Sequence, residues 1–133
     1  MADRIVNSVF FDEMIFASLN GVMRPLAPKR GAQWGMVLAT AEQTLGTAET
    51  GYKLRLLQAI VSVETAQSRV SFNSKPSGAG TQRFEHSFPI GVTILPREEL
   101  GYMDSATSEG ISVDVTAGGG TVAASILYVA IPV

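Results

Sequence analysis

Alternating apolar and polar positions dominate the last third of the chain. From Ile111 to Thr116, β-branched side chains alternate with polar ones, which is the two-residue period of a strand with one buried and one solvated face. A triple glycine at 118–120 then interrupts the pattern, because glycine enters positive φ without a steric penalty. The final run, from Val122 to Ile131, is apolar on both alternating faces. It predicts a strand that is covered on both sides.

Short segments with the same strand character fill the chain after Trp34. They lie at 34–40, 52–63, 69–73, 83–88, 92–95 and 102–104. The short turn between 52–63 and 69–73 predicts that these two form a hairpin. Within 52–63 the apolar positions change phase between Leu56 and Leu57, so the strand has either a β-bulge or two buried faces. About eight short strands without a helical period predict an all-β, single-domain β-sandwich that is jelly-roll-like.

The N-terminal region allows more than one interpretation. Residues 4–19 suit a helix or a strand, and the Asn20-Gly21 turn signal favours a hairpin between 14–19 and the chain from Val22 onward. Segment 24–31 contains two prolines and a basic cluster, which predict an exposed loop or a contact surface for an acidic partner. We therefore expect 1–43 to be an N-terminal arm or hairpin with docking or oligomer contacts, and 44–133 to be the β-sandwich core.

Composition limits the classes of function. A chain of 133 residues suits one domain, and no apolar run reaches the roughly 18 residues of a membrane span. The charged start Met1-Ala-Asp-Arg4 does not resemble a signal peptide. The net charge is −2, from 10 basic and 12 acidic residues, without the basic stripe that nucleic-acid binding requires. The absence of cysteine excludes disulfides and thiolate chemistry. We expect no nucleic-acid or membrane partner.

The candidate catalytic side chains are few and scattered. The single histidine, His86, lies in phase with Phe84 and Phe88, which predicts a half-buried structural side chain rather than a metal ligand or a general base. Glu98, Glu99 and Asp104 would have to converge to form an acid pair for glycoside cleavage. A charged loop edge is the simpler interpretation, because adjacent strand residues point to opposite faces.

Glycine and aromatic positions give no clearer site. The glycines at 78, 80 and 118–120 lack the spacing of a phosphate-binding loop, and no Gly-x-Ser-x-Gly nucleophile motif occurs. Trp34 and Tyr102 could stack on a sugar or a partner, although core or interface packing is the usual role of isolated aromatics. The sequence therefore predicts a protein that is not an enzyme, with no catalytic, cofactor-binding or metal-binding residues.

A succession of turn and strand cues from about Thr44 to Ile131 resembles small β-sandwich proteins encoded among the virion genes of tailed bacteriophages. The cues are Tyr52-Lys-Leu-Arg-Leu-Leu57, Arg69-Val-Ser-Phe72, Leu95-Pro96, Gly101-Tyr-Met103, the turn from Ser105 to Val113, and the closing run from Thr121 to Ile131. Residues 1–43 fall outside the resemblance, where such a protein would carry its docking arm. These cues concern turns and packing, so no functional residue is carried over.

The resemblance implies a capsid decoration, cement or head-fibre protein, jelly-roll-like and often trimeric. We accordingly expect a phage virion structural protein on the capsid surface that binds and stabilises the major capsid protein lattice. The alternative is a receptor- or glycan-binding jelly-roll module on a head fibre or tail. A metal-dependent enzyme of the double-stranded β-helix type would need more than one histidine. The doubly apolar closing strand further predicts a homotrimer, with Leu127 and Val129 or segment 10–16 in the contact.

Overall fold

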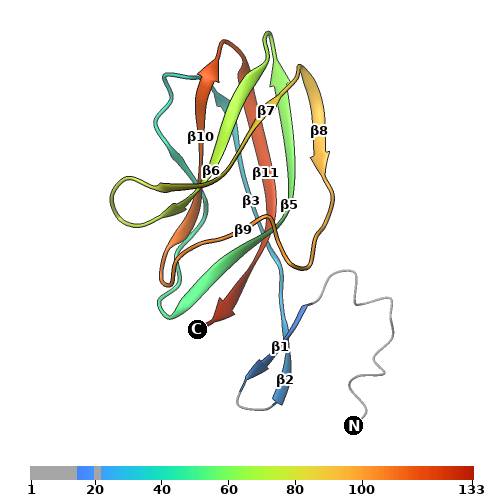
Figure 1. Cartoon of the computed structure of the whole chain (residues 1–133), viewed down its shortest axis with the longest axis vertical. Coiled ribbons are helices and arrows are strands. Elements are labelled where there is room, and N and C mark those ends of the chain that lie inside the picture. The colour runs from blue at the N-terminus through green and yellow to red at the C-terminus, as the bar shows by residue number, and fades with distance from the viewer. Residues whose placement is uncertain (1–14, 20–21) are drawn as a thin grey trace.

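The computed structural model describes residues 15–19 and 22–133 of the chain, and within these ranges every regular element is a strand (Figure 1). There are eleven: β1 (Ile15–Leu19), β2 (Val22–Leu26), β3 (Lys29–Met36), β4 (Gln43–Gly46), β5 (Tyr52–Glu64), β6 (Ser68–Lys75), β7 (Thr81–Phe88), β8 (Gly91–Leu95), β9 (Met103–Asp104), β10 (Gly110–Gly118) and β11 (Thr121–Pro132).

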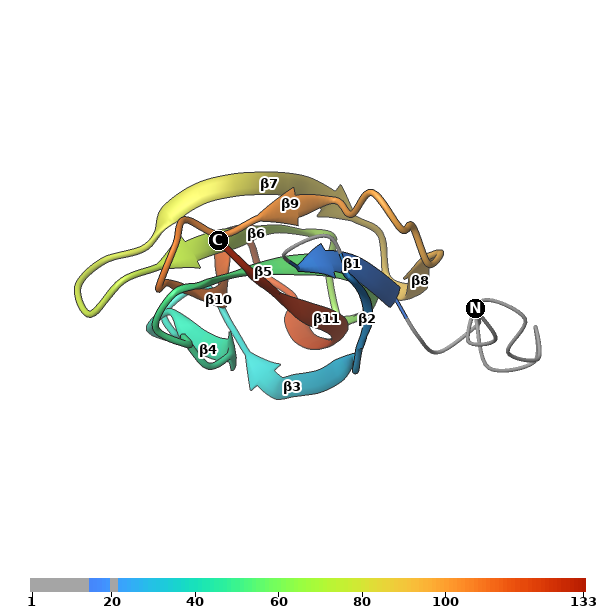
Figure 2. The same ribbon diagram turned by 90° about the horizontal axis from the view of Figure 1, so that it is seen from below.

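Two antiparallel sheets form the body of the molecule. One has the order β3-β11-β5-β8, with β9 also paired to β5, and the other has the order β4-β10-β6-β7. If β3–β8, β10 and β11 are numbered one to eight along the chain, the sheets contain strands 1-8-3-6 and 2-7-4-5. This is the arrangement of a jelly roll, in which two Greek keys wrap around one core. The predicted all-β, jelly-roll-like sandwich is confirmed. Figure 2 shows it from below.

The predicted hairpin between β5 and β6 is wrong. β5 pairs with β11, β8 and β9, whereas β6 pairs with β10 and β7, so the two strands belong to different sheets. The turn at Thr65, whose φ is 82°, carries the chain from one sheet to the other. The apolar side chains of the two strands meet across the core, because Val61 of β5 and Phe72 of β6 belong to one buried cluster.

The sandwich begins earlier than residue 44. β3 starts at Lys29, within the segment expected to be a loop, and pairs with β11 from Val122 to Tyr128. Pro28 immediately precedes this edge strand, so it removes no ladder hydrogen bond. β1 and β2 pair with each other as an antiparallel hairpin, which extends below the sandwich in Figure 1. The helix-or-strand question for 4–14 lies outside the described residues.

The phase change in β5 is a β-bulge. Leu127 of β11 lies opposite Gln58 and Tyr128 lies opposite Leu56, which leaves Leu57 without a partner on that strand. One extra residue reverses the alternation. Leu54 and Leu56 therefore share the core face with the alternating residues from Ala59 to Val63, while Leu57 points to the opposite side of the sheet.

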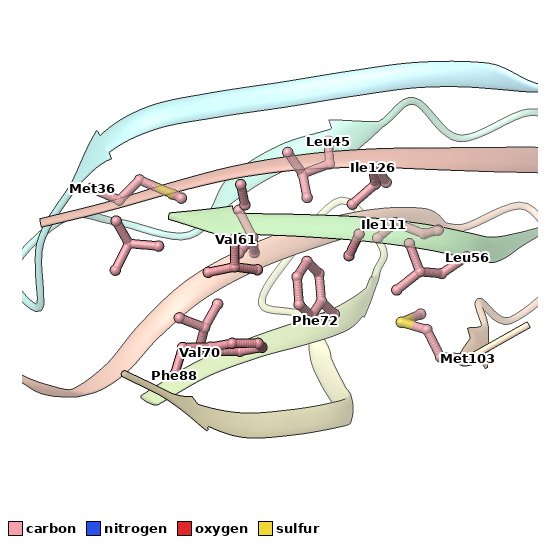
Figure 3. Packing of buried hydrophobic residues seen from close by; sticks show 14 of the residues in the cluster. Met36, Leu45, Leu56, Val61, Val70, Phe72, Phe88, Met103, Ile111 and Ile126 are labelled. Carbon is pink, nitrogen blue, oxygen red and sulfur yellow. The ribbon is translucent and has the colours of Figure 1, made fainter. Parts of the chain in front are cut away.

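The main core lies between the two sheets. Phe72, which is fully buried, occupies its middle between residues from both sheets, such as Val61 and Ile111 (Figure 3). A second, smaller cluster lies on the other side of the five-stranded sheet, where Leu26 and Ile131 cover three buried side chains. These are Leu57, Leu127 and Val129.

The second cluster changes the expectation for the closing strand. β11 is covered on both sides, as its sequence predicts, but Leu127 and Val129 are 6% and 0% exposed within a single chain. Their cover includes Leu26 at the end of β2. They are therefore not available for the three-fold contact that the sequence suggested, and the alternative contact segment 10–16 extends beyond the described residues.

Candidate interaction surface

The single histidine lies at the edge of the four-stranded sheet. His86 is exposed on β7, the edge strand of the four-stranded sheet, and is not half-buried as expected. Its ring lies edge-on between Phe84 and Phe88, with centroid distances of 5.6 and 6.0 Å. His86 packs with Phe84 and Phe88, in phase with them as the alternation predicts. It is nevertheless exposed, because β7 is the outermost strand of its sheet. His86 is a peripheral packing residue.

Two of the three candidate carboxylates, Asp104 and Glu99, are paired with cations. Asp104 accepts hydrogen bonds from Arg55 at 2.8 and 3.0 Å and pairs with Lys53 at 3.0 Å. Burial raises the pKa of Asp104, but the hydrogen bonds from Arg55 and Lys53 outweigh it, so the net pKa is lowered. Glu99 pairs with Arg97 at 3.1 Å, and Glu98 is exposed. An ionised, paired Asp104 is poorly suited to donating a proton.

The glycines and the tyrosine also have structural roles. Gly118 turns the chain between β10 and β11 with a φ of 97°, and Gly120 donates its N–H to Ser68 Oγ at 2.9 Å. The ring of Tyr102 packs 5.7 Å from Phe84, and its hydroxyl donates to the Pro96 carbonyl. The ring is therefore already stacked within the chain.

A carboxylate that the sequence did not single out organises the outside of the four-stranded sheet. Glu42, in the loop between β3 and β4, accepts hydrogen bonds from Asn73 Nδ2 at 2.8 Å, Gly80 N at 3.0 Å and the Ser112 hydroxyl, and pairs with Lys75 at 3.4 Å. Burial raises its pKa, but these donors outweigh burial and lower it overall. Through these contacts Glu42 fixes the loop between β3 and β4 to the four-stranded sheet.

The outer face of the five-stranded sheet carries a different surface, which we call the apolar face. It consists of Ala32, Trp34, Ile60, Ser62, Val92, Ile94, Ala123 and Ser125. The strand registers set it out in two rows across four strands: Ala123 lies opposite Ser62, which lies opposite Val92, and in the next row Ser125 lies opposite Ile60. None of the eight residues is charged.

The apolar face is open to solvent. Trp34, Val92 and Ile94 are 76%, 65% and 60% exposed. The intervening residues of β5 and β11, such as Val61 and Ala124, point into the main core, so the face is the other side of a fully packed sheet. Exposed apolar surface in one contiguous patch marks an interaction site more often than scattered single residues do.

Charged residues lie at the two ends of the apolar face. At one end Glu64 and Trp34 border a shallow hollow of about 230 Å³. At the other end Arg30 and Arg97 border a pocket of about 80 Å³ beside Leu127. Arg97 Nη2 is buried and has no hydrogen-bond partner among the described residues.

The comparisons with known proteins name no relative. No family model and no curated protein matches the chain. Among the residues that the structure describes, no helix is long and apolar enough to cross a membrane. Within the same residues, no three His, Cys, Asp or Glu side chains are grouped so as to hold a metal ion. The site must therefore be interpreted from its own geometry.

The sequence contained a signal for part of this face. Val92 and Ile94 alternate with Thr93 and Leu95, so at least one apolar residue lies on whichever side of the strand faces away from the core. The sequence did not assign Trp34 to the exposed face, because residues two apart in a regular strand, such as Trp34 and Met36, lie on the same face. Gly35, with a φ of 72°, changes the phase, so that Met36 is buried in the core while Trp34 is exposed.

Proposed function

We propose that this protein is a structural subunit of a tailed-bacteriophage virion that binds the outer surface of the assembled capsid. The observation that carries the proposal is the apolar face on a jelly roll whose interior is filled by its own side chains. The hollows described on this body, of about 80 to 360 Å³, open to solvent, and the apolar face presents a surface suited to protein contact. The sequence cues from Tyr52 to Ile131 support the virion assignment.

Binding of this kind would stabilise the capsid by mass action. A subunit that binds the assembled lattice and not the free capsid protein shifts the equilibrium toward the lattice. The hairpin β1–β2 extends away from the sandwich and would supply the contact with the capsid protein (Figure 1). The sandwich itself would remain outside, on the capsid surface.

One observation favours the alternative, a receptor- or glycan-binding module on a head fibre or tail. Trp34 is a largely exposed aromatic ring, and such rings stack on sugars. Tyr102 and Asp104 do not add to such a site, because the ring packs on Phe84 and the carboxylate is paired with Arg55. The capsid role therefore has the stronger support.

The test is binding to capsids that lack the protein. Purified full-length chain is added to such capsids from the phage that encodes it, and the particles are sedimented. We expect saturable co-sedimentation at a fixed number of copies per particle and a higher temperature of capsid disruption. Binding to host-cell glycans with no co-sedimentation would support the alternative, and failure to bind capsids under any condition would refute the proposal.

A further inference from the structure

The apolar face has opposite charges at its two ends. Glu64 extends from β5 beyond one row, in register with Thr121, and Arg30 of β3 lies beyond the other row, in register with Leu127. Arg97 also borders the Arg30 end, where its guanidinium is already paired with Glu99 at 3.1 Å. The eight residues between these ends are uncharged. A face with this layout complements an identical face that is turned end over end.

We propose that the apolar face joins two copies of this chain about a two-fold axis that runs across the strands, midway between the two rows. Rotation about this axis exchanges the rows and brings the Glu64 end of each copy over the Arg30 end of the other. The two ends are separated by three two-residue steps along the strands, about 20 Å in all. Both ends are therefore the same distance, about 10 Å, from the axis.

Side-chain sizes match in this arrangement. Trp34 of one copy lies over the row that holds Ala32 of the second, so the largest side chain of the face meets one of the smallest. Val92 lies over Ile94 of the second copy, and Ile60 lies over Ser62. Each of these contacts occurs twice, as an isologous interface requires.

The ends of the face add polar contacts. The Glu64 carboxylate of one copy would lie near Arg30 and Arg97 of the other copy. Its position is displaced by about one strand spacing, 4.8 Å, from the pocket beside Leu127. A carboxylate there gives the exposed Arg30 guanidinium charge-assisted hydrogen bonds. The pair contains two such contacts.

The size of the face bounds the area that the pair can bury. The two rows of the apolar face, together with the row of residues beyond each end, span four strands and cover about 500 Å² on each copy, or about 1,000 Å² in total. This is at the lower limit for a specific interface, so we expect a reversible dimer that forms at micromolar concentration. The two-fold symmetry replaces the three-fold arrangement expected from the sequence, which relied on the internally covered Leu127 and Val129.

Charge reversal tests the proposal in solution, without capsids. Sedimentation velocity over a range of concentrations should show the full chain approaching twice its 14.1 kDa mass. Glu64→Arg and Arg30→Glu should each remain monomeric, because like charges then face each other twice. An equimolar mixture of the two variants should dimerise again, because both contacts of the mixed pair join opposite charges. Val92→Asp, in the middle of the face, should also be monomeric.

Arg83→Glu is the matched control, since it reverses an exposed charge on β7 of the other sheet and should leave the dimer unchanged. Far-ultraviolet circular dichroism must show every variant to be folded. A parent chain that is monomeric at all concentrations, or trimeric, overturns the proposal. So do charge-reversed variants that still dimerise, or a mixture that stays monomeric. A monomeric parent whose Val92→Asp variant loses capsid binding would assign the face to the capsid protein, with the virion role intact.

Discussion

Replacement of Glu42 tests how the loop between β3 and β4 is fixed to the sandwich. Glu42→Gln keeps the size of the side chain but removes its charge and one of its two acceptor oxygens. Ser112 is fully buried and Asn73 is 6% exposed, so water cannot fully replace the lost acceptor. Lys75, 3.4 Å from the carboxylate, loses its ion pair and keeps only its hydrogen bond to the Gly78 carbonyl.

The magnitude follows from the donors that lose an acceptor. A hydrogen bond to a charged group contributes about 1.5–3 kcal/mol, and a buried donor without an acceptor costs about 1–3 kcal/mol. With one accepting oxygen left for donors from Ser112, Asn73 and Gly80, we expect Glu42→Gln to lower the free energy of unfolding by about 2–4 kcal/mol. For a chain of this length that lowers the melting temperature by roughly 10 °C.

The effect depends on pH with a definite sign. The folded-state pKa of Glu42 is lower than its ordinary value, so its contribution is fully present above the unfolded pKa of about 4.3 and is lost as the pH falls through the folded pKa. The difference in stability between the parent and Glu42→Gln should therefore be largest at neutral pH and decrease in acid.

Urea unfolding monitored by circular dichroism at neutral and acidic pH measures both quantities. Glu98→Gln is the control, because Glu98 is exposed and such changes usually alter stability by about 0.5 kcal/mol or less. A Glu42→Gln variant as stable as the Glu98→Gln control at neutral pH would refute this account of the loop. A stability difference that is the same at both pH values would refute the role of the charge.

Three further substitutions probe the packing. Gly31→Ala would place a Cβ atom 1.8 Å from a backbone carbonyl oxygen of β4, so we expect a loss of about 3 kcal/mol in urea unfolding, whereas Gly78→Ala, with open space around it, should be neutral. Val129→Asp should unfold the single chain, because the charge is buried, and a folded monomer by circular dichroism and gel filtration would contradict this. Leu57→Ala should cost about 2–5 kcal/mol in the same unfolding assay, and the exposed Leu100→Ala should cost almost nothing.

Local patterns in the sequence predicted most strands but few of their partners; β3, expected at 34–40, spans Lys29–Met36, and β4 was not predicted. The alternation from Ile111 to Thr116 and the phase change at Leu57 both have direct counterparts, because hydrophobic period records which side of a strand is buried. It does not record which strand lies alongside. The 52–63 and 69–73 segments looked like a hairpin because the turn is short, yet that turn crosses between sheets.

The candidate surface required long-range information of the same kind. Glu42, the pair Asn73 and Gly80, and Ser112 come from three separate parts of the chain, so no single sequence motif contains them. The apolar face is likewise assembled from four strands. Its rows exist only once the register of β3, β11, β5 and β8 is known.

The position of β11 near the end of the chain determines when the sheets can form during synthesis. β11 separates β3 from β5, and β10 likewise separates β4 from β6, so both sheets remain split until the C-terminal strands arrive. Tyr128 pairs with Lys29, 99 residues earlier in the chain, and such non-local pairing makes folding slow. Until then each sheet of the nascent chain lacks a central strand, and the strands on either side of that gap have unpaired edges. Unpaired strand edges can accept a strand from a neighbouring copy, so we expect translation at high density to favour domain-swapped or aggregated chains, and chaperones that shield strand edges to raise the yield.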